Sequence, residues 1–227
     1  VIITAFAPTL YFFTPIAAFA GGVIAFFMVY CLSWKGGLSP MRIILTGVAV
    51  NSLFTGLSSA LNSMSGGDRT GVAAIVEANI TQKTWDDVMT LLPYVIAGLF
   101  LAMLFTQECN LLSLEDKTAR SLGVNVNVTR IVISLVAVLL ASISTAVAGA
   151  ISFLGLIVPH IGRILVGSDH KMLLPFSAVF GAFTFLLADT IGRTIAAPNE
   201  VSAAVIMSVV GGPFFILLLR RSGKYGK

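Results

Sequence analysis

The segment GAISFLGLIVPHIGRILVGSDHKMLLPFS, residues 149–177, lies in the most apolar half of the chain. It nevertheless contains Pro159 and His160 side by side, and Arg163 follows three residues later. Proline lacks the backbone N–H that a helix interior uses, and charged side chains are costly in lipid. The segment therefore indicates an interruption within a membrane-embedded region.

The apolar run around this segment extends from residue 131 to residue 166. At 1.5 Å per helical residue, this run is too long for one membrane crossing, so we expect it to fold back. Gly149 is one available breaker, and we place the structural helix break at Gly155, Pro159 and His160. The short span that remains has an irregular backbone, which must be buried in protein or line a cavity.

Composition supports a membrane location. Hydrophobic residues make up 57% of the 227 residues and charged residues 11%, with a mean hydropathy of +0.97. Soluble domains average about 45–50% apolar and about 25% charged residues. The net charge of +4 does not indicate nucleic-acid binding, because the basic residues lie between apolar runs rather than along one stripe. The chain begins inside an apolar segment, and we expect it to lack an N-terminal part.

Seven apolar spans are expected to be transmembrane helices, because backbone groups in lipid must be hydrogen-bonded within their own segment. The alternating pattern of a membrane β-barrel does not occur. The predicted fold class is all-α, a polytopic membrane helix bundle that forms a single transmembrane domain over residues 1–227. A stub at 1–11 precedes the spans, which are 14–33, 40–62, 89–106, 131–150, 152–166, 174–195 and 201–219.

Lysine and arginine are distributed unequally between the two sides of these spans. Three of the fourteen lie around 63–88 and 193–200, and the other eleven lie in 34–42, 107–130, 163–173 and 220–227. Cytoplasmic loops of membrane proteins carry an excess of Lys and Arg. The sequence therefore predicts that the larger set is cytoplasmic and that the loop 63–88 is extracytoplasmic.

The loop 110–130 is too long for a tight connection and too amphipathic for an unstructured one. Leu111, Leu114, Ala119 and Leu122 recur at near-helical spacing, and Gly123 supplies a helix stop before a second short segment. We predict two short helices at the cytoplasmic surface. They form either a membrane-surface helix pair or a docking platform for a soluble partner.

Asp189 and Arg193 are spaced i, i+4 near the outer end of a span. Charged residues inside a membrane tend to pair and to face protein or water. One interpretation is mutual neutralisation along a single helix face. The other is a functional contact of the arginine at the outer surface.

No catalytic, cofactor or metal site is expected. His160 has neither a second histidine at i+4 nor a nearby carboxylate, and Cys31 and Cys109 are far apart in sequence. The GxxxxGK[ST] phosphate loop is absent, so the chain is not expected to hydrolyse ATP itself. An ATPase-independent carrier or channel is a second class of function. Carriers often use buried carboxylates to couple transport to ions. Asp189 is the one acidic residue within a span and lies near the end of that span, which argues against proton coupling.

Several segments together point to one family. Gly-Leu-Ile-Val-Pro-His, a following Arg, Gly-x-Asp-His and Leu-Leu-Pro occur within 155–175, and LADTIGR and GGPFFILLL follow at 187–193 and 211–219. Upstream, ILTGVAVNSLFTGLSS at 44–59 and ARSLGVNV at 119–126 fit the same pattern. The chain resembles the FecCD family of ABC-transporter permeases, which import ferric siderophores, haem or cobalamin.

This resemblance implies a BtuC-like permease of a type II ABC importer, with about seven to eight of the family's ten transmembrane helices in this chain. It implies a second permease subunit, as homodimer or close heterodimer, a pair of cytoplasmic ATP-binding subunits, and an extracytoplasmic substrate-binding lipoprotein. The expected location is a bacterial cell membrane, surrounded by lipid and without nucleic acid. The expected cargo is an iron complex, ferric siderophore or haem, with cobalamin as the alternative.

The resemblance also implies roles for individual residues. The loop 110–130 matches the family's coupling helices, which seat in the ATPase subunit, and the expected coupling residues are Leu114, Arg120, Leu122 and Gly123. Arg193 matches an outer arginine that pairs with glutamates of the binding protein. Asp189 is expected to restrain Arg193 until that partner arrives.

The outer segment 71–88 departs from the family pattern. Relatives usually carry a Gly- or Ser-rich stretch with tryptophans here, whereas this chain keeps Trp85 but has the unusually polar sequence EANITQK. Asp86 and Asp87 are expected to cap the start of the next helix.

Overall fold

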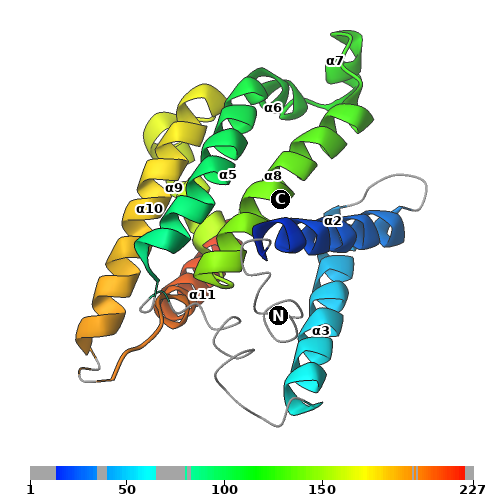
Figure 1. Cartoon of the computed structure of the whole chain (residues 1–227). Helices are drawn as coiled ribbons and strands as arrows, with labels where there is room; N and C mark the ends of the chain where they lie inside the picture. The colour runs from blue at the N-terminus through cyan, green and yellow to red at the C-terminus, as the bar shows by residue number, and fades with distance from the viewer. Residues whose placement is uncertain are drawn as a thin grey trace. The chain divides into compact units, whose positions relative to one another are not determined.

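The computed structural model describes residues 14–34, 40–64, 80, 83–195, 197 and 199–222, and every element in this part of the chain is a helix (Figure 1). The predicted stub at 1–11 lies outside the described residues. In chain order the helices are α2 (Thr14–Ser33), α3 (Pro40–Met64), α5 (Trp85–Leu104), α6 (Thr106–Leu112), α7 (Asp116–Ser121), α8 (Val126–Ala148), α9 (Leu154–Val166), α10 (His170–Ile195) and α11 (Ala203–Ser222).

Each of the seven predicted spans contains one helix, which confirms the prediction of an all-α polytopic bundle. Helices α2, α3, α5, α8 and α10 are long and apolar enough to cross a membrane, and α9 and α11 are further apolar helices. The largest boundary differences are at the starts of α5, α8 and α10, which begin four or five residues before the predicted spans. Their first turns contain polar residues, so hydropathy alone underestimates their length.

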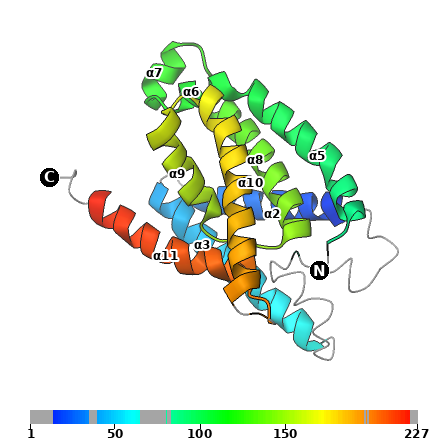
Figure 2. The same cartoon turned by 90° about the vertical axis from the view of Figure 1, so that its left-hand side faces the viewer.

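The chain divides into two compact units. Their helices are labelled in Figures 1 and 2. Among the described residues, unit 1 contains α2, α3, the first part of α5 up to Gly98, and α8 from Ser134 to Val147. Unit 2 contains the end of α5, helices α6 and α7, the start of α8, and α9 to α11. The division thus passes through α5 and α8, and each unit has its own packing.

In unit 1, α2 packs against α3, and glycines allow two close helix contacts with α8. A Cβ atom added at Gly22 would collide with Ser142, and one added at Gly98 would collide with the side chain of Leu140. Small residues of this kind let membrane helices approach closely.

A side-chain cap marks the start of α5. The backbone N–H of Thr84 donates to Asp87 Oδ2 at 2.9 Å, and the Thr84 hydroxyl donates to the same oxygen at 3.3 Å. This is the reciprocal half of a capping box, with a carboxylate at the third helical position. The predicted cap is therefore confirmed for Asp87, while Asp86 lies in the first turn, where its charge favours the positive end of the helix dipole.

The core of unit 2 lies where α9, α10 and α11 meet. Its buried residues are small or aliphatic, and larger side chains such as Phe185 and Phe214 pack around them. The buried set consists of Ile157, Ala188, Ala203 and Met207. Helix α6 also packs against α10, so the short helices of the 110–130 region belong to the same unit.

The predicted position of the helix break is wrong. Gly155, Pro159 and His160 all lie inside α9, whereas the non-helical segment runs from Gly149 to Phe153. Both ends of this segment have left-handed backbone, with φ of 77° at Gly149 and 64° at Phe153. The run is interrupted as expected, but at the earlier glycine.

Tertiary contacts explain why the break lies there. Phe153 adopts a conformation that costs a non-glycine residue roughly 1–2 kcal/mol, but it packs on α11 at Gly211, where any Cβ would collide with it. Pro159 removes only the hydrogen bond to the carbonyl of Gly155, and the ring of His160 packs edge-on against Phe214 with centroids 5.9 Å apart. Packing within unit 2 therefore holds α9 helical through its proline.

Candidate functional site at the two ends of unit 2

The first part of the candidate site is the α6–α7 surface, defined here as residues 113–125, which follow α6 and include α7. The structure has two short helices here, as predicted, but their placement differs: α6 and α7 both precede Gly123, whereas the prediction placed one helix before Gly123 and a second short segment after it. Ala119 is buried and anchors α7, whereas Leu114 and Leu122 are 44% and 60% exposed. The surface thus presents two apolar side chains outward from an anchored base.

The end of α7 is set by Gly123, which confirms the predicted helix stop. Gly123 has φ of 84°, its N–H donates to the carbonyl of Arg120 at 3.0 Å, and the N–H of Val124 donates to the carbonyl of Ala119 at 3.2 Å. This pair of bonds is the Schellman motif, which depends on a left-handed residue and so favours glycine. The chain direction after α7, and with it the exposure of Leu122, follows from this glycine.

Charge on the α6–α7 surface is partly neutralised. Asp116 at the start of α7 accepts a hydrogen bond from Arg130 of α8 at 3.1 Å, an exposed pair worth about 1 kcal/mol at most. Arg120 is exposed and makes no ion pair with any residue in the described ranges. It borders a shallow hollow of about 450 Å³ that continues along Gly123 to Asn127. Arg120 and Lys117 are thus exposed cations beside the exposed leucines.

The two cysteines lie in separate helices, Cys31 in α2 and Cys109 in α6. Cys31 and Cys109 are free thiols, and burial together with the neighbouring Glu108 raises the pKa of the Cys109 thiol. The thiol therefore stays protonated near neutral pH, which disfavours nucleophilic or metal-binding chemistry. Within the described part of the chain, no three His, Cys, Asp or Glu side chains lie close enough to hold a metal ion.

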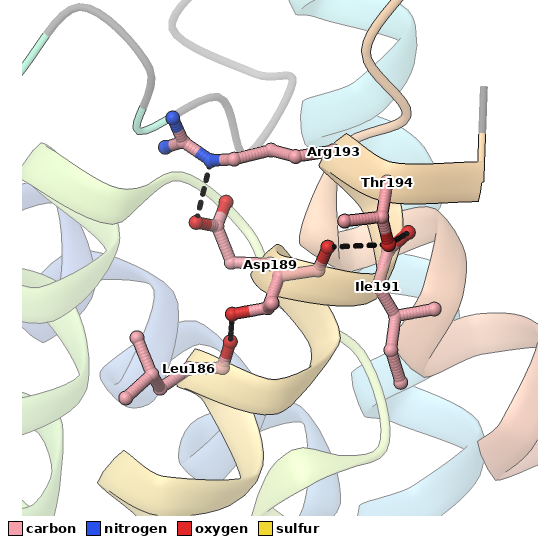
Figure 3. Close-up of polar contacts among 6 residues, drawn as sticks. Leu186, Asp189, Ile191, Arg193 and Thr194 are labelled. Atoms are coloured by element: carbon pink, nitrogen blue, oxygen red, sulfur yellow. Dashed lines mark hydrogen bonds and ion pairs between the residues drawn. The ribbon is translucent and has the colours of Figure 1, made fainter. Parts of the chain in front are cut away.

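The second part of the candidate site is the ion pair near the end of α10 (Figure 3). Arg193 Nε donates to Asp189 Oδ2 at 2.8 Å, and the side chains are 40% and 15% exposed, respectively. The acid precedes the base by four residues near the helix C-terminus, an order that also suits the helix dipole. Figure 3 shows that the two terminal nitrogens of the guanidinium point away from Asp189. They leave a fork that can bind a second carboxylate.

The two parts lie at opposite ends of α10. Asn110 of α6 is hydrogen-bonded to His170, the first residue of α10, and Arg193 lies in the last turn. At 1.5 Å per residue these positions are about 35 Å apart, which compares with a hydrocarbon core of about 30 Å. The structure thus brings Leu114, Arg120, Leu122 and Gly123 together at one end of unit 2, with Asp189 and Arg193 near the other.

A polar face on α3 was not predicted from the sequence. Exposed hydroxyl side chains at i, i+4 spacing donate to carbonyls one turn earlier, from Thr55 to Asn51 at 2.8 Å and from Ser59 to Thr55 at 3.0 Å. Ser63 continues the series to Ser59 at 3.0 Å. The signal was present as the spacing of polar residues within NSLFTGLSSALNS, residues 51–63, but hydropathy averaging hides it. A polar face in a membrane helix needs protein or water beside it.

Comparisons with known proteins agree with this arrangement. The FecCD transport family matches residues 1–221. The iron(3+)-hydroxamate import system permease protein FhuG of Bacillus subtilis (strain 168) is 38% identical over 212 residues, which are 93% of this chain and 63% of FhuG. The "Probable heme-iron transport system permease protein IsdF" of Staphylococcus aureus (strain Newman) is 39% identical over 217 residues, 96% of this chain and 65% of IsdF. The chain therefore spans somewhat less than two thirds of these relatives.

One solved structure shows the same fold. A metal-chelate type ABC transporter in an inward-facing conformation matches with a TM-score of 0.74, covering 96% of this chain and 74% of that one. The sequence identity is 24%, so this match describes the arrangement of helices only.

Proposed function

The chain belongs to the FecCD transport family, and from this premise we propose that it is the membrane-spanning permease subunit of an ABC importer for iron complexes. The cargo class is a ferric hydroxamate or haem, because FhuG and IsdF bear those names and are 38% and 39% identical to this chain. The subunit acts without covalent chemistry, in a bacterial cytoplasmic membrane, as one of two permease subunits. ATP is hydrolysed by a separate pair of cytoplasmic subunits.

The observation that carries this proposal is the α6–α7 surface. Two exposed leucines and Arg120, which makes no ion pair within the described ranges, lie in or beside α7, and a Schellman motif at Gly123 ends that helix. An apolar side chain on a rigid helix end can seat in a groove of a soluble partner. We assign this surface to the contact with the ATP-binding subunits, on the side where Lys and Arg are concentrated.

The cargo path is assigned to the polar face of α3. Its hydroxyl groups are exposed and satisfied by backbone carbonyls, so the face is polar but uncharged. Such a surface can be wetted without holding a charged chelate tightly, as a path with weak binding requires. The second permease subunit would supply the opposite wall.

The proposal predicts ATP-dependent uptake by the intact transporter. In vesicles that contain the permease, its ATP-binding subunits and its binding protein, radioactive ferric hydroxamate or haem is expected to accumulate only with internal ATP. Labelled cobalamin, offered in parallel, is expected to remain outside. Accumulation by the permease alone without ATP would show a secondary carrier or channel and contradict the proposal.

Arg193 is expected to steer the substrate-binding protein to the outer surface. Exchanging Arg193 for Glu should slow association of that protein on the order of tenfold at low salt, because charge complementarity acts mainly on the association rate. Asp189→Asn, the matched control on the same helix, frees the guanidinium and should keep or raise the rate. Stopped-flow binding to the intact transporter measures both, and an equal loss in the two variants would argue for a purely structural pair.

A further inference from the structure

A hydrogen-bonded cluster joins α6 to the start of α10, and none of its members was assigned a role above. Asn110 lies in α6, while Asp169 and His170 lie 59 and 60 residues later. Asn110 Nδ2 donates to Asp169 Oδ1 at 2.8 Å, the His170 backbone N–H donates to Asn110 Oδ1 at 2.9 Å, and His170 Nδ1 lies 2.6 Å from the same oxygen. We refer to these three residues as the Asn110 clamp.

The chemistry of the partners sets the orientation of the amide. A backbone N–H can only donate, so the atom of Asn110 facing His170 must be its oxygen, and the amide nitrogen then faces the Asp169 carboxylate. Because that oxygen only accepts, His170 Nδ1 carries a hydrogen. Both polar atoms of the Asn110 side chain are therefore used, and neither a leucine nor an aspartate can reproduce the pattern.

Asp169 also organises the first turn of α10. Its side chain accepts the backbone N–H of Lys171 at 3.0 Å, and its carbonyl accepts the N–H groups of Met172 and Leu173. The hydrogen bond from Asn110, followed by that from Lys171, lowers the pKa of the Asp169 carboxyl. Because the folded-state pKa is lowered, the stabilisation from the ionised Asp169 carboxylate is fully present above its unfolded-state pKa of about 3.9. It is lost only as the pH falls through the lower folded-state pKa. Protonation of Asp169 therefore does not weaken its bond to Asn110 near neutral pH.

We propose that Asn110 is a positioning residue that transmits movement of the α6–α7 surface to α10. This proposal rests on the proposed function, in which the ATP-binding subunits displace that surface. Helix α6 contacts α10 and is bonded to its first turn, so displacement of α6 moves the start of a 26-residue helix whose other end carries Arg193. Without the clamp, nucleotide-driven movement of α6 is dissipated at the α9–α10 turn.

The test compares cargo transported with ATP consumed in the intact transporter. Asn110→Leu is expected to leave ATP hydrolysis within about twofold but to reduce ferric hydroxamate uptake per ATP about tenfold, which equals 1.4 kcal/mol of coupling. Asn110→Asp should act similarly, because it sets two carboxylates against each other. Gln107→Leu is the matched control, since it makes the same kind of change at an exposed position of α6 and should leave the ratio unchanged.

A double variant separates positioning from general destabilisation. Asn110→Asp combined with Asp169→Asn restores one amide–carboxylate pair and is expected to recover most of the uptake per ATP. An unchanged ratio in Asn110→Leu, a parallel loss of uptake and ATP hydrolysis, or no recovery in the double variant would each overturn the inference.

Hydrogen exchange distinguishes failure of the clamp from failure of the proposed function. In the purified transporter, Asn110→Leu should accelerate amide exchange at 170–173, and Gln107→Leu should not. Unchanged exchange would overturn the inference. If the unmodified transporter takes up no iron complex with ATP, the proposed function fails, whereas the exchange result still reports on the clamp.

Discussion

Replacing Arg120 with glutamate is expected to weaken binding of the ATP-binding subunits about thirtyfold or more, and to abolish ATP-driven uptake. A loss of about 2 kcal/mol is typical when a central interface residue is removed, and every 1.4 kcal/mol is a factor of ten. Arg120 is exposed, lies one turn from Asp116 on α7, and borders the hollow next to Gly123. In the glutamate variant, a carboxylate would face the acidic or carbonyl groups of the ATP-binding subunit that bind the arginine, and it would be repelled by them.

Co-purification of the ATP-binding subunits with the intact permease measures this effect. Lys83→Glu is the matched control, because it makes the same charge reversal at an exposed position on the predicted outer side. The control should bind the subunits normally, whereas Leu122→Glu should fail as Arg120→Glu does. Equal loss in the Lys83 variant would contradict both the docking surface and the predicted topology, and external labelling of a cysteine placed at Lys117 in intact cells would contradict the topology directly.

Gly192→Ala is expected to destabilise unit 2 by about 2 kcal/mol or more, and to reduce the yield of folded transporter. A Cβ at this buried position of α10 would collide with the backbone carbonyl of Val201, which cannot rotate away as a side chain can. The same segment is held by a hydrogen bond from the Val201 N–H to the Gly192 carbonyl at 3.2 Å. Overpacking costs typically about 1–3 kcal/mol, more than the helix propensity of alanine returns.

A second glycine of the same helix gives the control. A Cβ at Gly181 would lie 3.7 Å from a methyl group of Val158, an ordinary contact, so Gly181→Ala should be neutral or stabilising by up to about 1 kcal/mol. Thermal unfolding of the purified transporter in detergent measures both variants. Similar unfolding temperatures for the two variants would show that the backbone of residues 199–202 shifts to accommodate the new Cβ atom with little loss of stability.

The helices were predictable because lipid imposes a simple rule on the backbone. An apolar segment in lipid has to satisfy its own N–H and C=O groups, so hydropathy located all seven spans. The spacing of leucines indicated short helices near 110–130, but it did not predict that both end before Gly123. The Schellman stop at Gly123 was also readable, since it depends on one residue with positive φ and on local bonds. The i, i+4 pairing of Asp189 with Arg193 was one of two readings that followed from helix geometry, and the structure contains that pair.

Contacts between distant segments were not readable in this way. The missing backbone N–H of proline favoured a break at Gly155, Pro159 and His160. Instead, Phe153 packs on Gly211 in a left-handed conformation, and α9 runs through the proline. The sequence pattern gave Asn110 no role, whereas the structure shows it hydrogen-bonded to Asp169 and His170.

Sequence by itself thus determined which segments cross the membrane, which surface is amphipathic and which family the chain resembles, because these depend on local composition and on spacing within one helix. Only the tertiary structure decided that α9 continues through Pro159, which glycines tolerate a side chain, and how α6 is tied to α10. Those properties depend on contacts between separate segments, such as the contact between Gly192 and Val201 and the bond from Asn110 to Asp169, and no local pattern encodes those contacts.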